Sequence, residues 1–186
     1  LQGDVGSGKT LVALMSMLIA LDNGYQACMM APTEILAAQH FETIRQMLFG
    51  MNVRVELLMG SVKGKKREEI LKGLLTGEVQ ILIGTHAVLE DTVNFASLGM
   101  VVIDEQHRFG VAQRNALAEK GEGVDMLVMS ATPIPRTLSL IFYGDLDVTT
   151  ITDKPSVRQE ISTGIIPESK YDDMLEYVRK ETAAGK

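Results

Sequence analysis

Eight residues near the start of the sequence have the types and the spacing of a phosphate-binding loop. The stretch Gly3-Asp4-Val5-Gly6-Ser7-Gly8-Lys9-Thr10 fits the pattern G-x-x-x-x-G-K-[ST] and leads directly into an apolar helical pattern. Gly6 and Gly8 permit torsions that turn successive backbone N–H groups inward, and the N-terminus of a helix favours an anion. Lys9 can reach the β- and γ-phosphates of a nucleotide, and the Thr10 hydroxyl can ligate Mg²⁺. The loop therefore predicts a site for a nucleoside triphosphate with Mg²⁺.

Two carboxylates, Asp104 and Glu105, directly follow the apolar run 101–103. In open parallel sheets, ligands bind at the carboxyl ends of the strands. An Asp at such an end can hold Mg²⁺, which prefers oxygen ligands, and an adjacent Glu can orient the water that attacks a γ-phosphate. A strand-terminal acidic pair by itself is equally compatible with a solvated pair. Its combination with the phosphate loop favours hydrolysis of the bound nucleotide.

Three further polar side chains follow the ends of predicted strands. His107 is suited to a hydrogen-bonding relay better than to metal binding, because no second His or Cys lies near it in the sequence. Ser130 and Thr132 follow the next apolar strand and can face that imidazole. They can equally cap the helix expected to begin near Pro133 and Pro135, and both roles are compatible.

Short apolar runs alternate with longer helical patterns, which predicts an α/β fold with a mostly parallel sheet flanked by helices. The expected strands are residues 27–31, 53–59, 79–84, 100–104, 125–130 and 147–151. The expected helices are residues 10–21, 34–48, 66–75, 111–120 and 135–142. Because the sequence begins at Leu1, the strand expected ahead of the phosphate loop is truncated, and we expect an internal piece of a longer protein.

Length and charge limit the organisation of the chain and its partners. The 186 residues suit one domain plus a fragment, and the composition changes near residue 150. We expect a nucleotide-binding domain at 1–151, followed at 152–186 by a linker, a strand at 158–166, a helix at 170–182 and the beginning of a second domain. The net charge of −6 argues against binding nucleic acid through overall electrostatic attraction alone.

The single cysteine and the apolar runs indicate the compartment. One cysteine, Cys28, excludes a disulfide framework and fits a reducing compartment. No apolar run reaches the roughly 20 residues of a membrane-spanning helix. We therefore expect no membrane partner.

Five short motifs, in this order, resemble those of superfamily 2 helicases. They are the phosphate loop, Ala31-Pro32-Thr33-Glu34, Gly84-Thr85-His86, Asp104-Glu105-Gln106-His107 and Ser130-Ala131-Thr132, which resemble motifs I, Ia, Ib, II and III. Within the superfamily, residues 104–111 and 131–138 resemble the RecG family of branched-DNA helicases. The related transcription-repair coupling factors usually have Glu where this sequence has Gln106. A translocase domain of that kind, or a nucleotide-binding P-loop module without helicase activity, is the alternative.

The resemblance implies a RecA-like P-loop NTPase domain that hydrolyses ATP with Mg²⁺ to remodel branched DNA, such as forks and Holliday junctions, in recombination and repair. It assigns nucleotide binding to Gly3, Asp4, Val5, Gly6, Ser7, Gly8, Lys9 and Thr10, and catalysis to Lys9, Glu105, Gln106 and His107. It assigns Mg²⁺ to Thr10 and Asp104, and the coupling of hydrolysis to DNA contact to Ser130 and Thr132. It places Pro32, Thr33, Gly84, Thr85, His86, Arg108 and Phe109 along branched or double-stranded DNA, read without regard to base sequence.

The resemblance also implies parts that this sequence lacks. A superfamily 2 motor has a second RecA-like domain, whose arginine fingers stabilise the transition state, and RecG helicases add a wedge domain that engages forks. We therefore expect the chain alone to bind nucleotide and to turn it over poorly. The resemblance also implies a bacterial, cytoplasmic protein.

Overall fold

A computed structural model describes residues 1–105, 109–132, 147–152 and 164–184. The chain divides into two units, Leu1–Pro155 and Ser156–Lys186. In the second unit, a short 3-10 helix η3 (Glu168–Lys170) leads into helix α6 (Tyr171–Ala183), close to the helix predicted at 170–182. Residues 164–166, the described end of the strand predicted at 158–166, are not a strand.

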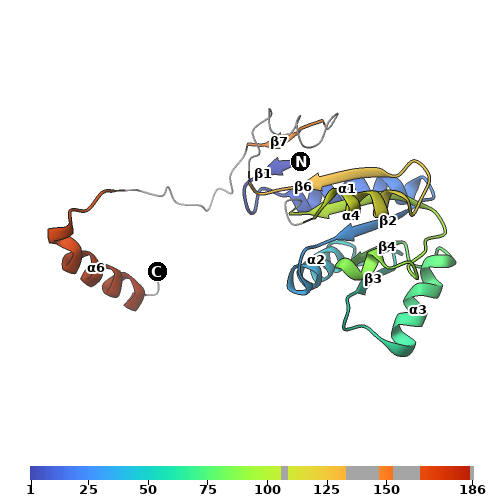
Figure 1. Cartoon of the computed structure of the whole chain (residues 1–186), viewed down its shortest axis with the longest axis horizontal. Helices are drawn as coiled ribbons and strands as arrows, with labels where there is room; N and C mark the ends of the chain where they lie inside the picture. The colour runs from blue at the N-terminus through green and yellow to red at the C-terminus, as the bar shows by residue number, and fades with distance from the viewer. Residues whose placement is uncertain (106–108, 133–146, 153–163, 185–186) are drawn as a thin grey trace. The chain divides into compact units, whose positions relative to one another are not determined.

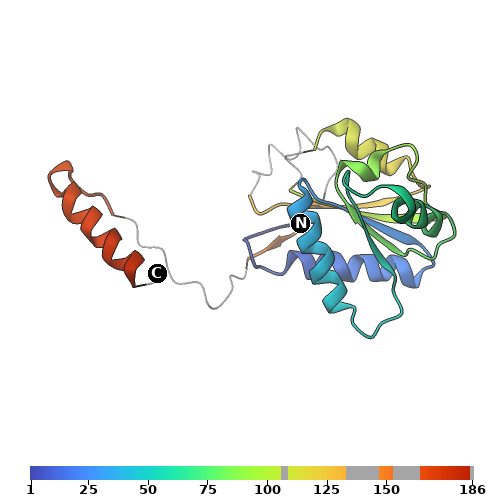
Figure 2. The ribbon, with the colours of Figure 1, turned by 90° about the horizontal axis from the view of Figure 1, so that it is seen from below.

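The first unit contains a five-stranded parallel sheet with helices on both faces (Figure 1 and Figure 2). The sheet strands are β2 (Gln26–Met30), β3 (Val55–Leu58), β4 (Ile81–Gly84), β5 (Leu98–Asp104) and β6 (Asp125–Met129), in the order β3-β4-β2-β5-β6. The helices are α1 (Lys9–Asp22), α2 (Glu34–Met47), α3 (Gly64–Leu75), the 3-10 helix η1 (His86–Leu89) and α4 (Val111–Ala118). The predicted α/β architecture is therefore confirmed, while the helix predicted at 135–142 lies outside the described residues.

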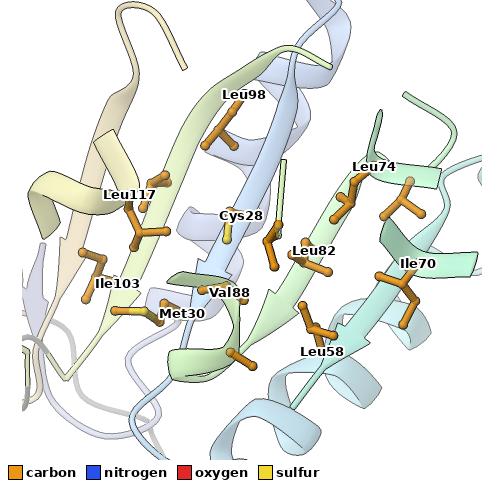
Figure 3. Close-up of a cluster of buried hydrophobic side chains, with 14 of the residues drawn as sticks. Cys28, Met30, Leu58, Ile70, Leu74, Leu82, Val88, Leu98, Ile103 and Leu117 are labelled. Atoms are coloured by element: carbon orange, nitrogen blue, oxygen red, sulfur yellow. The ribbon is translucent and has the colours of Figure 1, made fainter. Parts of the chain in front are cut away.

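Alternation along the buried strands divides the core into two layers. Cys28 and Met30 of β2 face the layer beneath α3, η1 and α4, which Figure 3 shows. Ala27 and Met29 of the same strand face α1 and α2. Since successive side chains of a strand point to opposite faces, a strand covered on both sides must be apolar throughout, as β2 is.

One buried polar side chain, Gln26, joins the end of α3 to two loops at the amino end of the sheet. Its amide nitrogen donates to the carbonyls of Leu74 (3.0 Å) and Val79 (2.7 Å), and its amide oxygen accepts from the N–H of Ser97 (2.9 Å). Gln26 is 4% exposed, so these bonds satisfy a side chain that water barely reaches. The contact holds the loops before β4 and β5 in register with β2.

One of two short predicted strands is shorter than expected. The sequence predicts a strand at 147–151 and a truncated strand ahead of the phosphate loop. The structure has β7 at Thr150–Ile151 alone, and it pairs in parallel with the two-residue β1 at Gln2–Gly3. Residues 147–149 are not a strand, and Leu1, which precedes β1, bonds to Val128 and Ser130 instead. Within the described residues, no helix combines the length and the apolar character needed to cross a membrane.

Candidate functional site

The phosphate loop connects β1 to α1 and adopts the conformation that its glycines predict. Gly6 and Gly8 have φ angles of 80° and 90°, in the left-handed region that glycine adopts without a steric penalty. Gly8 is the N-cap of α1, and no described side chain caps this helix end. The first turn of α1 therefore presents its positive end toward the loop, which suits an anion.

The Lys9 side chain folds across the loop. Its ammonium donates to the carbonyl oxygens of Gly3 and Asp4, each at 2.8 Å. An ammonium has three N–H donors, so these two bonds leave one donor for an anionic ligand. A Cβ at Gly3 would lie 2.5 Å from the Ser7 hydroxyl oxygen, so a larger residue here would require the Ser7 side chain to shift.

Residues 1–3 bring the phosphate loop beside the end of β6. The backbone N–H of Ser130 donates to the Leu1 carbonyl at 3.1 Å, and the Gly3 N–H donates to the Ser130 carbonyl at 3.3 Å. The Ser130 hydroxyl bonds the Thr132 hydroxyl at 2.9 Å, and it accepts from the Thr132 N–H at 3.2 Å. The two hydroxyls thus stabilise the turn after β6. Their predicted approach to His107 falls outside the described residues.

The two carboxylates lie at the carboxyl end of β5, where the sequence predicts them. Asp104 is 7% exposed, and its Oδ1 accepts from the N–H of Glu105 at 3.0 Å. Glu105 has a φ of 52°, which makes it the one non-glycine residue with a positive φ among the described residues. A non-glycine residue in this region carries backbone strain, which persists where the surroundings hold the residue in place.

A cleft of about 420 Å³ joins the phosphate loop to the acidic pair. It is lined by Val5, Gly6, Gly8, Lys9, Thr10, Leu11, Leu36, Met47, Asp104, Glu105, Met129 and Ala131. Two sequence segments that lie far apart in the chain therefore meet in one cleft, as the open-sheet rule predicts.

The oxygen donors in the cleft suit Mg²⁺ bound together with a phosphate ligand. The described residues contain no group of three or more His, Cys, Asp or Glu that would hold a metal by themselves. The cleft instead offers the Thr10 hydroxyl and the Asp104 carboxylate. Mg²⁺ is commonly held by one or two carboxylates plus the phosphates of a substrate, so this donor set fits the ion.

His40 of α2 belongs to the site and was not among the residues that the sequence predicted. Its Nε2 lies 2.7 Å from Oδ2 of Asp104, and the two side chains are 13% and 11% exposed. His40 lies one turn of helix after Leu36, which lines the cleft in the structure. Nothing in the sequence, however, indicates how close α2 lies to the end of β5.

The residues assigned to DNA lie at the same carboxyl edge of the sheet but differ in exposure. Thr33 is exposed, and its hydroxyl caps α2 by accepting from the Leu36 N–H at 3.2 Å. Pro32 is half-buried, and His86 is exposed. Gly84 and Thr85 are buried, and a Cβ on Gly84 would lie 2.3 Å from the Leu58 carbonyl oxygen.

Phe109 is part of the hydrophobic core. It is 6% exposed, and its ring lies 5.5 Å from the ring of His86, tilted by 49°. The buried Phe109 ring therefore contacts the exposed His86 ring. The remaining predicted residues of this region, Gln106, His107 and Arg108, lie outside the described residues.

Comparison with known proteins gives a consistent result. The family model of the DEAD/DEAH box helicases matches residues 1–141. Over the whole chain, the sequence is 49% identical to the ATP-dependent DNA helicase RecG of Thermotoga maritima, 51% to that of Synechocystis and 48% to that of Bacillus subtilis. The chain covers 24%, 22% and 27% of these proteins, so it spans about a quarter of their length. The resemblance to RecG helicases is confirmed.

Solved structures show the same relationship. A structure of RecG bound to a three-way DNA junction matches the whole chain with a TM-score of 0.83 and 46% identity, over 25% of that chain. The Dbp5 protein of Saccharomyces cerevisiae matches 82% of the chain with a TM-score of 0.61 and 17% identity, which shows the fold alone. The predicted RecA-like architecture is thereby confirmed. With a family model that matches three quarters of its length, the chain belongs to the DEAD/DEAH box helicase family.

Proposed function

We propose that this chain is the ATP-binding motor domain of a DNA helicase that remodels branched DNA. The observation that carries the proposal is the cleft in which the phosphate loop faces the acidic pair. Membership of the DEAD/DEAH box helicases and the similarity to RecG over the whole chain support helicase chemistry in this cleft. In the proposed organisation, residues 1–151 bind ATP and residues 152–186 lead into a second motor domain.

The loop and α1 bind the triphosphate. Inward-facing backbone N–H groups of residues 3–8 and the positive end of α1 contact the phosphate oxygens. Lys9, already aligned by the carbonyls of Gly3 and Asp4, directs its remaining N–H toward the β- and γ-phosphates. These contacts require no base recognition, so they explain affinity for the phosphates rather than choice of nucleobase.

Thr10 and Asp104 hold Mg²⁺, which when bound neutralises part of the phosphate charge. Glu105 orients the water for in-line attack on the γ-phosphate and accepts its proton. Glu105 has a positive φ, so its backbone leaves the extended conformation of β5 at this residue. Glu105 lines the cleft. Gln106 and His107 complete the catalytic set in this proposal.

The carboxyl edge of the sheet contacts DNA through Pro32, Thr33 and His86, while the buried Gly84 and Thr85 position His86 at the end of β4. Backbone amides and hydroxyls at strand ends contact phosphates without reading sequence. The RecG structure with a three-way junction supports branched DNA as the substrate class. Arg108 and Phe109 follow the acidic motif, and the ring contact between Phe109 and His86 links that segment to the DNA edge. Ser130 and Thr132 complete the coupling between the two sites.

The chain alone is proposed to bind nucleotide and to hydrolyse it poorly. It spans about a quarter of the RecG proteins, so the second motor domain and the wedge domain would come from the rest of such a protein. Arginine fingers from a second domain are worth roughly 10³–10⁵ in rate where they operate. The bacterial relatives and the DNA substrate support a place in the bacterial cytoplasm.

Binding of a fluorescent ATP analogue, measured with and without Mg²⁺, tests the site. Lys9→Ala is expected to abolish binding, because the loop loses its only ammonium. Lys72→Ala, which removes an exposed ammonium from α3, is the matched control and should bind as the unaltered chain does. Equal binding by Lys9→Ala and Lys72→Ala would refute the assignment of the loop.

Hydrolysis with and without a three-way DNA junction tests the rest of the proposal. We expect slow turnover by the chain alone and DNA-stimulated turnover once the second motor domain is present. Fast, junction-stimulated hydrolysis by the chain alone would refute the requirement for a second domain.

A further inference from the structure

The contact between His40 and Asp104 joins two elements that are distant in the sequence. The two residues are 64 positions apart, and their side-chain atoms Nε2 and Oδ2 are separated by 2.7 Å. Both side chains are close to nine-tenths buried. A short, shielded hydrogen bond of this kind holds its two groups in a fixed relative orientation.

The direction of the bond follows from the chemistry of the carboxylate. An ionised carboxylate only accepts hydrogen bonds, so Nε2 of His40 carries the proton and donates. Oδ1 of the same carboxylate accepts from the Glu105 N–H at 3.0 Å. Each Asp104 oxygen therefore has one protein donor, and the carboxylate cannot rotate without losing both. Each oxygen also keeps lone-pair capacity for a metal ion or its bound water.

The placement of His40 on α2 brings it beside the cleft. Leu36, His40 and Met47 are spaced by four and seven residues, so they share one face of the helix. Leu36 and Met47 line the cleft. Ala37 and Ile44, which are fully buried, also pack α2 on the sheet, so the helix has apolar contacts besides this hydrogen bond.

We propose that His40 is a positioning residue for the Mg²⁺ site, since it fixes the Asp104 carboxylate in the orientation that receives the Mg²⁺ of a bound nucleotide. This inference rests on the proposed function of the cleft. Groups that hydrogen-bond a metal-ligating side chain typically change metal affinity by 10–100-fold when they are removed. His40 acts on the metal through Asp104, and it touches neither the nucleotide nor the reacting atoms.

The test measures how strongly Mg²⁺ tightens the binding of fluorescent ADP, as the ratio of the Kd in EDTA to the Kd in Mg²⁺. His40→Phe keeps a ring but has no N–H donor, and it is expected to lower this ratio about tenfold. His40→Gln places an amide N–H at the position of Nε2 and is expected to keep the ratio within about threefold. Gln39→Leu, at an exposed neighbour on α2, is the control for the helix itself.

Two further variants separate positioning from folding. His40→Asn keeps a polar side chain whose amide is too short to reach Asp104, so it is expected to behave as His40→Phe does. If the His40→Phe variant fails to fold, the His40→Asn variant tests the role of the N–H donor in its place. In an Asp104→Asn background, His40→Phe is expected to change the ratio no further, because the group through which His40 acts is already lost.

The outcomes distinguish this inference from the proposed function. If the unaltered chain binds ADP equally with and without Mg²⁺, the proposed Mg²⁺ site is wrong, and the role of His40 is wrong with it. If the unaltered chain depends on Mg²⁺ and His40→Phe or His40→Asn keeps the full ratio, only the role of His40 is overturned. If His40→Gln lowers the ratio of the two Kd values as much as His40→Phe does, the N–H donor of His40 does not position Asp104.

Discussion

The strained backbone at Glu105 leads to a prediction about stability. Its φ of 52° lies in the left-handed region, which costs a non-glycine residue about 1–2 kcal/mol. If Glu105 is kept for its proposed catalytic role, then Glu105→Gly should relieve the backbone strain and abolish ATP hydrolysis. The informative comparison is Glu105→Gly against Glu105→Ala, because both variants lose the same side-chain interactions.

The expected difference follows from two opposing contributions. Glycine avoids the left-handed penalty of about 1–2 kcal/mol that alanine retains. It also loses about 0.5–1 kcal/mol more backbone entropy on folding than alanine does. The free energy of unfolding of Glu105→Gly should therefore exceed that of Glu105→Ala by about 1 kcal/mol. For a domain of this size, this corresponds to a Tm higher by about 2–4 °C.

Urea unfolding, followed by circular dichroism, measures this difference if the m-values of the two variants agree. The matched control is the same pair of substitutions at Glu69, an exposed residue in the interior of α3 with helical backbone. At this control position, the free energy of unfolding of the glycine variant should be about 0.5–1 kcal/mol lower than that of the alanine variant. The sign of the difference is thus expected to invert between the two positions.

A Glu105→Ala variant as stable as Glu105→Gly would refute the strain at this residue. Both variants, and Glu105→Gln, should bind nucleotide and fail to hydrolyse it. Hydrolysis by Glu105→Gln at the rate of the unaltered motor, with branched DNA present, would refute the catalytic role separately from the strain.

Three further substitutions test the packing of the sheet. Gln26→Leu should lower the free energy of unfolding by about 2–4 kcal/mol, measured in urea, because it removes three hydrogen bonds and leaves the Val79 carbonyl and the Ser97 N–H without their partner. Gly84→Ala should lower the free energy of unfolding, measured by thermal unfolding, by about 3 kcal/mol, because the new Cβ would clash with the Leu58 carbonyl oxygen. Burial raises the pKa of the Cys28 thiol from 9.0 to about 12. The free energy of unfolding should therefore fall above about pH 9, by up to about 1.4 kcal/mol per pH unit. The Cys28→Ala variant should show a smaller fall over the same pH range.

The sign of the pH effect follows from proton binding. Above its ordinary pKa the thiol of unfolded chains loses its proton, while the buried thiol of Cys28 keeps it, so alkaline pH favours unfolding. Native Cys28 should also resist thiol reagents until the chain unfolds. Rapid modification in the native state, or equal pH slopes with and without Cys28, would contradict its burial. A Gln26→Leu or Gly84→Ala variant with unchanged stability would contradict the corresponding contact.

The sequence alone determined the chemistry of the phosphate loop and the position of the acidic pair in the fold. Both depend on local rules: glycines at fixed spacing ahead of a helix, and carboxylates directly after a buried strand. The alternation of strands and helices then requires a parallel sheet, whose carboxyl edge collects the strand ends. That is why Lys9, Asp104 and Glu105 could be predicted to share a site before any coordinates were known.

Only the tertiary structure decided which side chains meet across that edge. The contact between His40 and Asp104 depends on how α2 lies against β5, and the burial of Phe109 depends on how the chain after β5 packs over the sheet. The pairing of Gln2–Gly3 with Thr150–Ile151 likewise joins the two ends of the first unit. Sequence patterns report the periodicity of single elements, whereas these contacts arise from the packing of elements that are far apart in the chain.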